Sequence, residues 1–232
     1  MKKNLLLFIL TCFVMASTAW GQVEELSEKD TIATQRINEI REIWANNPIQ
    51  VKNDFPNARI RNFAKAFAGN YLQYRPNVAM VDYLKQPGEY DWSERNYYVE
   101  DDPRNGFIKC DIIGQFDYKT ELCYWRRPDG HLLVGVLLQV TNEGERSTAA
   151  LLFYDFDPET QVMSPDTKVY QTVKDVVAKH QGNAYFYLPQ EGKDIRVSTV
   201  YWSETDDFVY DDFLLIWKAN SFVEAKMEED GE

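Results

Sequence analysis

Among the residue types that commonly take part in catalysis, histidine is the scarcest in this chain of 232 residues. Only His131 and His180 occur, and they do not follow the HExxH spacing of zinc proteases. A serine or cysteine nucleophile would have to take its base from one of these two. The chain also lacks the Gly-x-Ser-x-Gly, P-loop and Gly-x-Gly-x-x-Gly patterns. We therefore predict no cofactor and no enzymatic activity as the main interpretation.

Basic residues are also in deficit. The chain has 25 lysines and arginines against 37 aspartates and glutamates, a formal net charge of −12. Nucleic acid and anionic membrane surfaces both require a basic face, so neither is a predicted partner. Beyond residue 21 no apolar run approaches the length of a membrane span, and we expect no span in the mature chain.

The first 21 residues have the pattern of a secretory signal peptide. Met1–Lys3 is basic, Leu5–Ala16 is apolar but too short to span a membrane, and Ala19–Gly21 offers small residues for cleavage. Cys12 is followed by further apolar residues, so we interpret it as ordinary signal-peptide content rather than a lipid anchor. The sequence therefore predicts export to the periplasm or the extracellular space.

The remaining chain divides by composition. Residues 22–92 are predicted to be helical, and residues 93–223 to form an antiparallel β-rich segment with one inserted helix, in the same domain as the helices. Residues 224–232 are predicted to be a frayed acidic tail. Helical periodicity is clearest in one buried face at i, i+3, i+4, i+7, i+8 and i+11. That face consists of Ile60, Phe63, Ala64, Phe67, Ala68 and Tyr71.

Three further helices are predicted around this one. The first should begin near Ser27, bury Ile37, Ile40, Ile43 and Trp44, and end before Pro48. Arg75-Pro76 is predicted to stop the second helix, and a short third helix should follow from Val78 to Lys85. Pro165-Asp166 should introduce the inserted helix, with Gly182 at its end. Its shared face is Tyr170, Val173 and Val177.

Arg127–Gly130 is predicted to be a tight turn between two strands. Proline presets the second φ angle, and glycine accepts the positive φ that closes the turn. This turn should pair Trp125 with Leu133 and Cys123 with Gly135. The run from Leu132 to Leu138 is apolar without alternation, which is typical of a strand covered on both faces.

Cysteine is almost as scarce as histidine, with three in the chain. A turn around Phe116-Asp117 would place Cys110 opposite Cys123, at a spacing that a disulfide can bridge. Because an exported protein meets an oxidising environment, we predict that this disulfide forms. The alternative is a pair of buried free thiols.

Carboxylates supply one weak metal candidate. Asp155, Asp157 and Glu159 alternate as calcium ligands do, but Thr160 and Asp166 stand where a calcium loop needs glycine and glutamate. We therefore interpret the segment as an acidic turn and predict no metal site.

Aromatic residues on predicted strands are the remaining candidates for ligand binding. Tyr124, Trp125, Tyr201 and Trp202 could hold a glycan or a peptide with their planar faces, although packing in the core or between strands is the main interpretation of them. The predicted function is a non-catalytic extracytoplasmic binding protein whose partner is a glycan or an envelope protein. A carboxylate-dependent glycan hydrolase is the alternative, since acidic residues are plentiful.

Three segments carry a resemblance that covers about Gly106 to Trp217. CYWRRPDGHLLVGVLLQV, LLFYDFDPETQVMSP and YFYLPQEGKDI are similar to a group of uncharacterised secreted proteins of gut Gram-negative anaerobes. The resemblance implies export and a β-rich fold, and it implies no site. The predicted fold class is α+β, with N-terminal helices packed on a mostly antiparallel sheet. An NTF2-like or cystatin-like cone and a β-sandwich with helical cover are both compatible.

Overall fold

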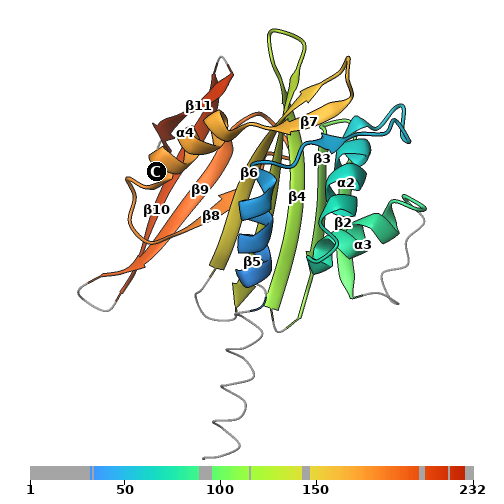
Figure 1. Cartoon of the computed structure of the whole chain (residues 1–232). Helices are drawn as coiled ribbons and strands as arrows, with labels where there is room; N and C mark the ends of the chain where they lie inside the picture. The colour runs from blue at the N-terminus through green and yellow to red at the C-terminus, as the bar shows by residue number, and fades with distance from the viewer. Residues whose placement is uncertain are drawn as a thin grey trace, which may run out of the picture.

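Two antiparallel sheets and four helices form the part of the chain that the computed structural model describes, residues 32, 34–88, 96–114, 116–142, 147–203, 207–218 and 220–227 (Figure 1). The larger sheet has the order β1-β7-β6-β5-β4-β3-β2, and the smaller has the order β11-β10-β9-β8. The α+β class and the antiparallel pairing are confirmed. The helices are not all N-terminal, since α4 lies between β7 and β8.

The elements have the following bounds. The larger sheet contains β1 (Ile49–Gln50), β2 (Tyr97–Asp102), β3 (Phe107–Ile112), β4 (Phe116–Arg126), β5 (Leu132–Asn142), β6 (Ser147–Asp157) and β7 (Val162–Pro165). The smaller sheet contains β8 (Asn183–Tyr187), β9 (Ile195–Trp202), β10 (Phe208–Lys218) and β11 (Ser221–Lys226). The helices are residues 34–44, α2 (Arg59–Asn70), α3 (Arg75–Tyr83) and α4 (Thr167–Val177).

The turn between β4 and β5 forms as predicted. Gly130 has a φ of +90°, and its amide donates to the Arg127 carbonyl at 3.2 Å. The register places Trp125 opposite Leu133 and Cys123 opposite Gly135. A Cβ on Gly135 would lie 2.8 Å from the Trp125 ring, so glycine leaves the space that this ring occupies.

The central strand β5 is covered on both faces, as its unbroken apolar run predicted. Val134 and Val136 belong to a core shared with the helix at residues 34–44, α2 and α3. Leu133 and Leu137 belong to a second core shared with α4 and the smaller sheet. The molecule therefore has helices on one face of the larger sheet, and the smaller sheet with α4 on the other (Figure 1).

The predicted buried faces of the helices agree with the structure better than the predicted first and last residues do. The predicted face of α2 is buried throughout, but Ile43 is 48% exposed rather than buried with the other apolar residues of its helix. Arg75 and Pro76 begin α3 instead of stopping α2, which ends at Asn70. Proline fits the first turn of a helix because the amide it lacks would have no partner there. The inserted helix ends at Val177, before the predicted end at Gly182.

The predicted disulfide is wrong. Cys110 and Cys123 are free and buried. Cys110 pairs with Thr120, while Cys123 lies opposite Phe107. The predicted turn was displaced along the chain, so the two cysteines are three residues out of register. An odd displacement places two side chains on opposite faces of a sheet. Accordingly, Cys110 belongs to the helical core and Cys123 to the core between the sheets.

We expect that a reducing agent will leave the thermal unfolding midpoint unchanged. Burial raises the pKa of both thiols well above the ordinary value, so the folded protein should not react with a thiol reagent. After unfolding without reductant, Cys110 and Cys123 should both titrate. A disulfide would contribute about 2–4 kcal/mol, so a drop of several degrees on reduction would contradict this prediction.

The predicted signal peptide and the predicted acidic tail lie at the two ends of the chain. Residues 1–21, the predicted signal peptide, lie outside the described residues. No helix within the described residues is long and apolar enough to cross a membrane. At the other end, the predicted tail starts too early, since Glu224 pairs with Leu215 in β11. Residues 228–232 lie outside the described part of the chain.

Candidate functional site

Trp125, one of the four aromatic candidates, is a core residue. It is 3% exposed, and its indole nitrogen donates to the Lys193 carbonyl at 2.7 Å. Its ring packs against Trp217 and Phe222, with centroids 6.0 and 5.2 Å away. Trp125 therefore joins the two sheets and offers no face to a ligand.

Of the other three aromatic candidates, Tyr124 and Tyr201 have side chains that the structure describes. Tyr124 lies on the opposite face of β4, with its ring 5.8 Å from Phe63. Tyr201 is partly exposed on β9. The backbone of Trp202 pairs with Phe208, while its side chain lies outside what the structure describes. Adjacent residues of a strand point to opposite faces, so a Tyr-Trp pair cannot form a single platform.

The acidic segment after β6 forms a turn, as the main interpretation predicted. The Asp157 carboxylate accepts from the Glu159 amide and from the Thr160 hydroxyl, each at 2.8 Å. Asp155 instead lies 2.6 Å from the Arg127 guanidinium. Among the described residues no group of three histidine, cysteine, aspartate or glutamate side chains could hold a metal ion.

Both histidines are held by carboxylates. The His131 Nδ1 lies 2.7 Å from Asp155, and this hydrogen bond raises the histidine pKa above its ordinary value. The His180 Nδ1 lies 2.6 Å from Asp211, and its ring stacks on Phe213 with centroids 3.9 Å apart. These contacts tie turns and strands together, and they bring neither histidine beside a cysteine thiol.

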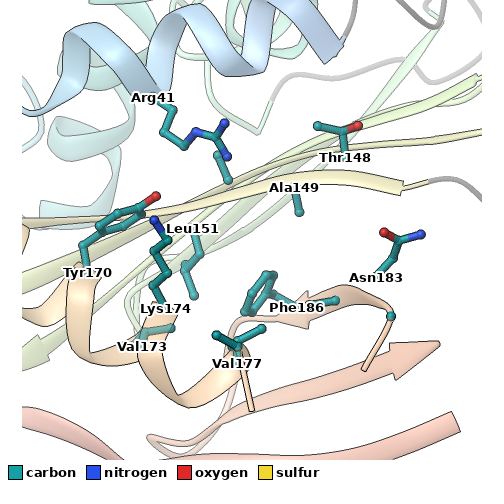
Figure 2. Close-up of a pocket in the computed structure, with 14 residues that line it drawn as sticks. Arg41, Thr148, Ala149, Leu151, Tyr170, Val173, Lys174, Val177, Asn183 and Phe186 are labelled. Carbon is teal, nitrogen blue, oxygen red and sulfur yellow. The ribbon is translucent and has the colours of Figure 1, made fainter. Parts of the chain in front are cut away.

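A groove that was not predicted from the sequence lies between β6, α4 and β8 (Figure 2). Its cavity is about 410 Å³ and has 14 lining residues, within the size range of small-ligand pockets. Residues 148–151 of β6 form one side, Val173 and Val177 of α4 the other. Arg41 reaches the groove from the helix at residues 34–44.

Among the strands that the structure describes, none pairs with the edge of β6 that borders this groove. β7 pairs only with Tyr154–Asp157, and the Asp166 amide then donates to the Phe153 carbonyl at 2.8 Å. Backbone groups along a strand alternate in direction with a period of two. The amides and carbonyls of Ala149 and Leu151 therefore point to the same open edge as the Phe153 carbonyl. Among the described residues no hydrogen bond reaches these groups.

A contact between the layers lies at each end of the open edge. The Thr34 and Thr148 hydroxyls lie 2.9 Å apart, at the start of β6. Near Phe153, the Tyr170 ring of α4 packs on Trp44, with centroids 4.9 Å apart. The helix at residues 34–44 thus flanks the edge on one face of the sheet, and α4 flanks it on the other.

The groove combines apolar walls with two charged residues. Its walls are apolar side chains of α4, β6 and β8, with Arg41 and Lys174 as its charged residues. Neither cation forms an ion pair with a described carboxylate; the Arg41 guanidinium donates only to the Asn38 side chain, at 2.8 Å. None of the 14 lining residues is an acid, a histidine or a cysteine, so the groove attracts anions and holds no titrating pair.

A second polar cavity, of about 340 Å³, lies on β3, β4 and β5, with Asp111 and Asp117 among its lining residues. Nearby Glu121 is 5% exposed. Burial raises the pKa of Glu121 above its ordinary value, although the Lys119 ammonium at 3.0 Å opposes the shift. A third cavity, of about 460 Å³, lies along α3 and includes Asn96, the first described residue after the gap at 89–95.

The sequence contained one usable signal for the groove. β6 has eleven residues and β7 has four, and the chain leaves the ladder after Asp166 because this residue caps α4. The length difference could have shown that most of β6 lacks a partner on that side. Which elements would border the open edge depended on contacts between distant segments.

Comparison with known proteins assigns no function to the groove. No family model matches the chain, and no curated protein or solved structure matches it. The resemblance to secreted proteins of gut anaerobes stays a prediction.

Proposed function

We propose that this chain is a non-catalytic extracytoplasmic binding protein whose ligand occupies the groove between β6, α4 and β8. The observation that carries the proposal is the groove itself, which combines apolar walls with a strand edge and two cations that have no partner strand or carboxylate among the described residues. Export rests on the signal-peptide pattern of residues 1–21. The layers of helices and two sheets favour the sandwich alternative for the fold.

The test is a ligand screen on three forms of the purified protein. Ala178 lines the groove at the end of α4 and is exposed, so Ala178→Trp should fill the groove without disturbing the core. Lys179→Trp places the same ring on the next residue, outside the lining, and serves as the control. The panel contains calcium, host and plant glycans, peptidoglycan fragments and short peptides.

We expect one ligand class to raise the unfolding midpoint of the wild type and of Lys179→Trp, but not of Ala178→Trp. A ligand at 100 times its dissociation constant stabilises a protein by about 2.7 kcal/mol, which is several degrees for a chain of this size. A ligand that stabilises all three forms equally would place the site elsewhere. A complete absence of shifts would count against the proposal.

The runner-up function is a glycan hydrolase at the polar cavity on β3, β4 and β5. One observation supports it: a general acid needs a carboxyl group with a raised pKa, and burial has this effect on Glu121. Glu121 is not a lining residue of that cavity, and Lys119 and the Leu188 amide hold its carboxylate, which favours a structural role. Turnover of any glycan in the same panel, abolished by Glu121→Gln, would replace the binding proposal.

A further inference from the structure

We propose that the ligand is an extended segment of another polypeptide, carrying acidic side chains, that adds to the larger sheet as a strand beside β6. This inference rests on the proposed function and specifies its ligand. It follows from the backbone groups on the open edge, from the layers above and below that edge, and from the charges within the groove.

The open edge offers a regular row of donors and acceptors. The amide and carbonyl of Ala149 face the groove, and those of Leu151 follow two residues later. A strand added at this edge presents its own carbonyls and amides at the same repeat. The unpaired stretch, residues 147–152, would span about 20 Å at about 3.3 Å per residue.

This edge also lacks the features that protect natural edge strands. Exposed edges usually carry charged residues, prolines or bulges that prevent pairing with another chain. Residues 148–153 of β6 are Thr, Ala, Ala, Leu, Leu and Phe, with no charge and no proline. The edge lies between the helix at residues 34–44 on one side and α4 with β8 on the other (Figure 2).

The helix at residues 34–44 and α4 would each contact one face of the added strand. Side chains of a strand alternate between the faces of its sheet. One set would point toward Arg41 on the helical side, and the other toward Val173 and Lys174 on the α4 side. Because these cations have no carboxylate partner among the described residues, an acidic side chain on each face would be complementary.

A glycan fits the groove less well than a peptide. Sugar sites commonly place a flat aromatic face against the ring, whereas Tyr170 packs on Trp44 and Phe186 is 9% exposed. The unsatisfied groups in the groove belong to the backbone of β6, and their regular spacing along one line matches another strand.

The first test is hydrogen exchange in the protein without ligand and with it. Amides of Ala149 and Leu151 face the open edge, while those of Ala150 and Leu152 face β5 in the ladder. We expect the first pair to exchange much faster than the second in the free protein. The probe is an end-blocked seven-residue peptide of valine and threonine with glutamate at two adjacent central positions, so that each face carries one carboxylate. Its binding should slow the first pair by about tenfold or more and leave the second pair unchanged.

The second test separates strand addition from other modes of binding. The same peptide is made with N-methyl groups either on the residues whose amides would pair with β6 or on the alternate residues. The first form should bind about tenfold more weakly or worse, because each methyl removes a ladder hydrogen bond. The second form should bind as the parent does.

The third test concerns charge. Arg41→Gln with Lys174→Gln should weaken binding of the acidic peptide by about tenfold and flatten its dependence on salt. Arg36→Gln with Lys168→Gln makes the same charge change on the same two helices outside the groove lining, and should leave the affinity unchanged. All four substituted side chains are exposed, so thermal unfolding should show that both variants fold.

The outcomes distinguish this inference from the proposed function. Equal binding of both N-methylated peptides would overturn strand addition. So would slow exchange of Ala149 and Leu151 in the free protein, or failure of the acidic peptide to bind. If a glycan binds instead and Ala178→Trp blocks it, the inference fails while the proposed function stands. If a peptide binds and Ala178→Trp has no effect, both fail.

Discussion

Phe153→Ala is expected to lower the free energy of unfolding by about 3–5 kcal/mol, the usual cost of truncating a fully buried phenylalanine. Phe153 lies on β6 with no exposed surface. Its ring packs against Phe222 of the smaller sheet, with centroids 5.5 Å apart, and against Trp125 of β4 at 6.4 Å. Its removal leaves a cavity where the two sheets meet, so hydrogen exchange should accelerate throughout β9, β10 and β11.

Urea unfolding measures the effect as a lower midpoint at an unchanged m-value. Tyr210→Ala is the matched control, because Tyr210 is 67% exposed on β10 and its loss should cost less than about 0.5 kcal/mol. Two separate unfolding transitions, with only the second affected, would show that the sheets are independent domains. A single transition shifted as predicted would establish that they fold as one unit.

Arg127→Met is expected to lower the free energy of unfolding by about 3 kcal/mol. The Arg127 side chain is 12% exposed and contacts the carboxylates of Asp155 and Asp166. Asp166 also caps α4, with its carboxylate accepting from the Val169 amide at 2.9 Å. Removing the guanidinium leaves the Asp166 carboxylate without its cation and Asp155 with His131 alone, which costs more than the loss of a surface pair.

Arg196→Met provides the comparison for this effect. The Arg196 side chain is 52% exposed and pairs with Asp212 at 2.7 Å, and surface pairs contribute about 0–1 kcal/mol. Arg127→Lys should recover part of the loss, since one ammonium cannot bind both carboxylates as a planar guanidinium does. Equal destabilisation by Arg127→Met and Arg196→Met would contradict the structural role given to Arg127.

Local chemistry explains which parts of the fold could be predicted from sequence. The Arg127–Gly130 turn depends on residues next to one another, so the register of Trp125 with Leu133 followed from it. The buried face of α2 could also be predicted from sequence, because its apolar repeat extends over the whole helix. The predicted register of β3 with β4 was wrong because Phe116-Asp117 has no comparable turn chemistry. The observed register differs from it by three residues, so Cys110 and Cys123 lie on opposite faces of the sheet.

Tyr124 and Trp125 do not share one surface, for a related reason. Tyr124 and Trp125 were grouped because they are adjacent in sequence, yet adjacency in a strand separates them onto opposite faces. Trp125 then packs with Trp217 and Phe222, residues that follow it by about ninety positions. Composition indicated that aromatic residues would be important, and only the packing of the sheets decided that this one belongs to the core.

The sequence by itself determined the acidic charge, the turn between β4 and β5, the buried face of α2 and the burial of β5 on both sides. Each of these depends on composition or on residues close together in the chain. The tertiary structure decided which layer covers each face and which edge stays open. The groove exists because β7 ends at Pro165 and because Thr34 contacts Thr148, 114 residues away. Contacts between such distant segments depend on how the layers pack, and no local pattern specifies them.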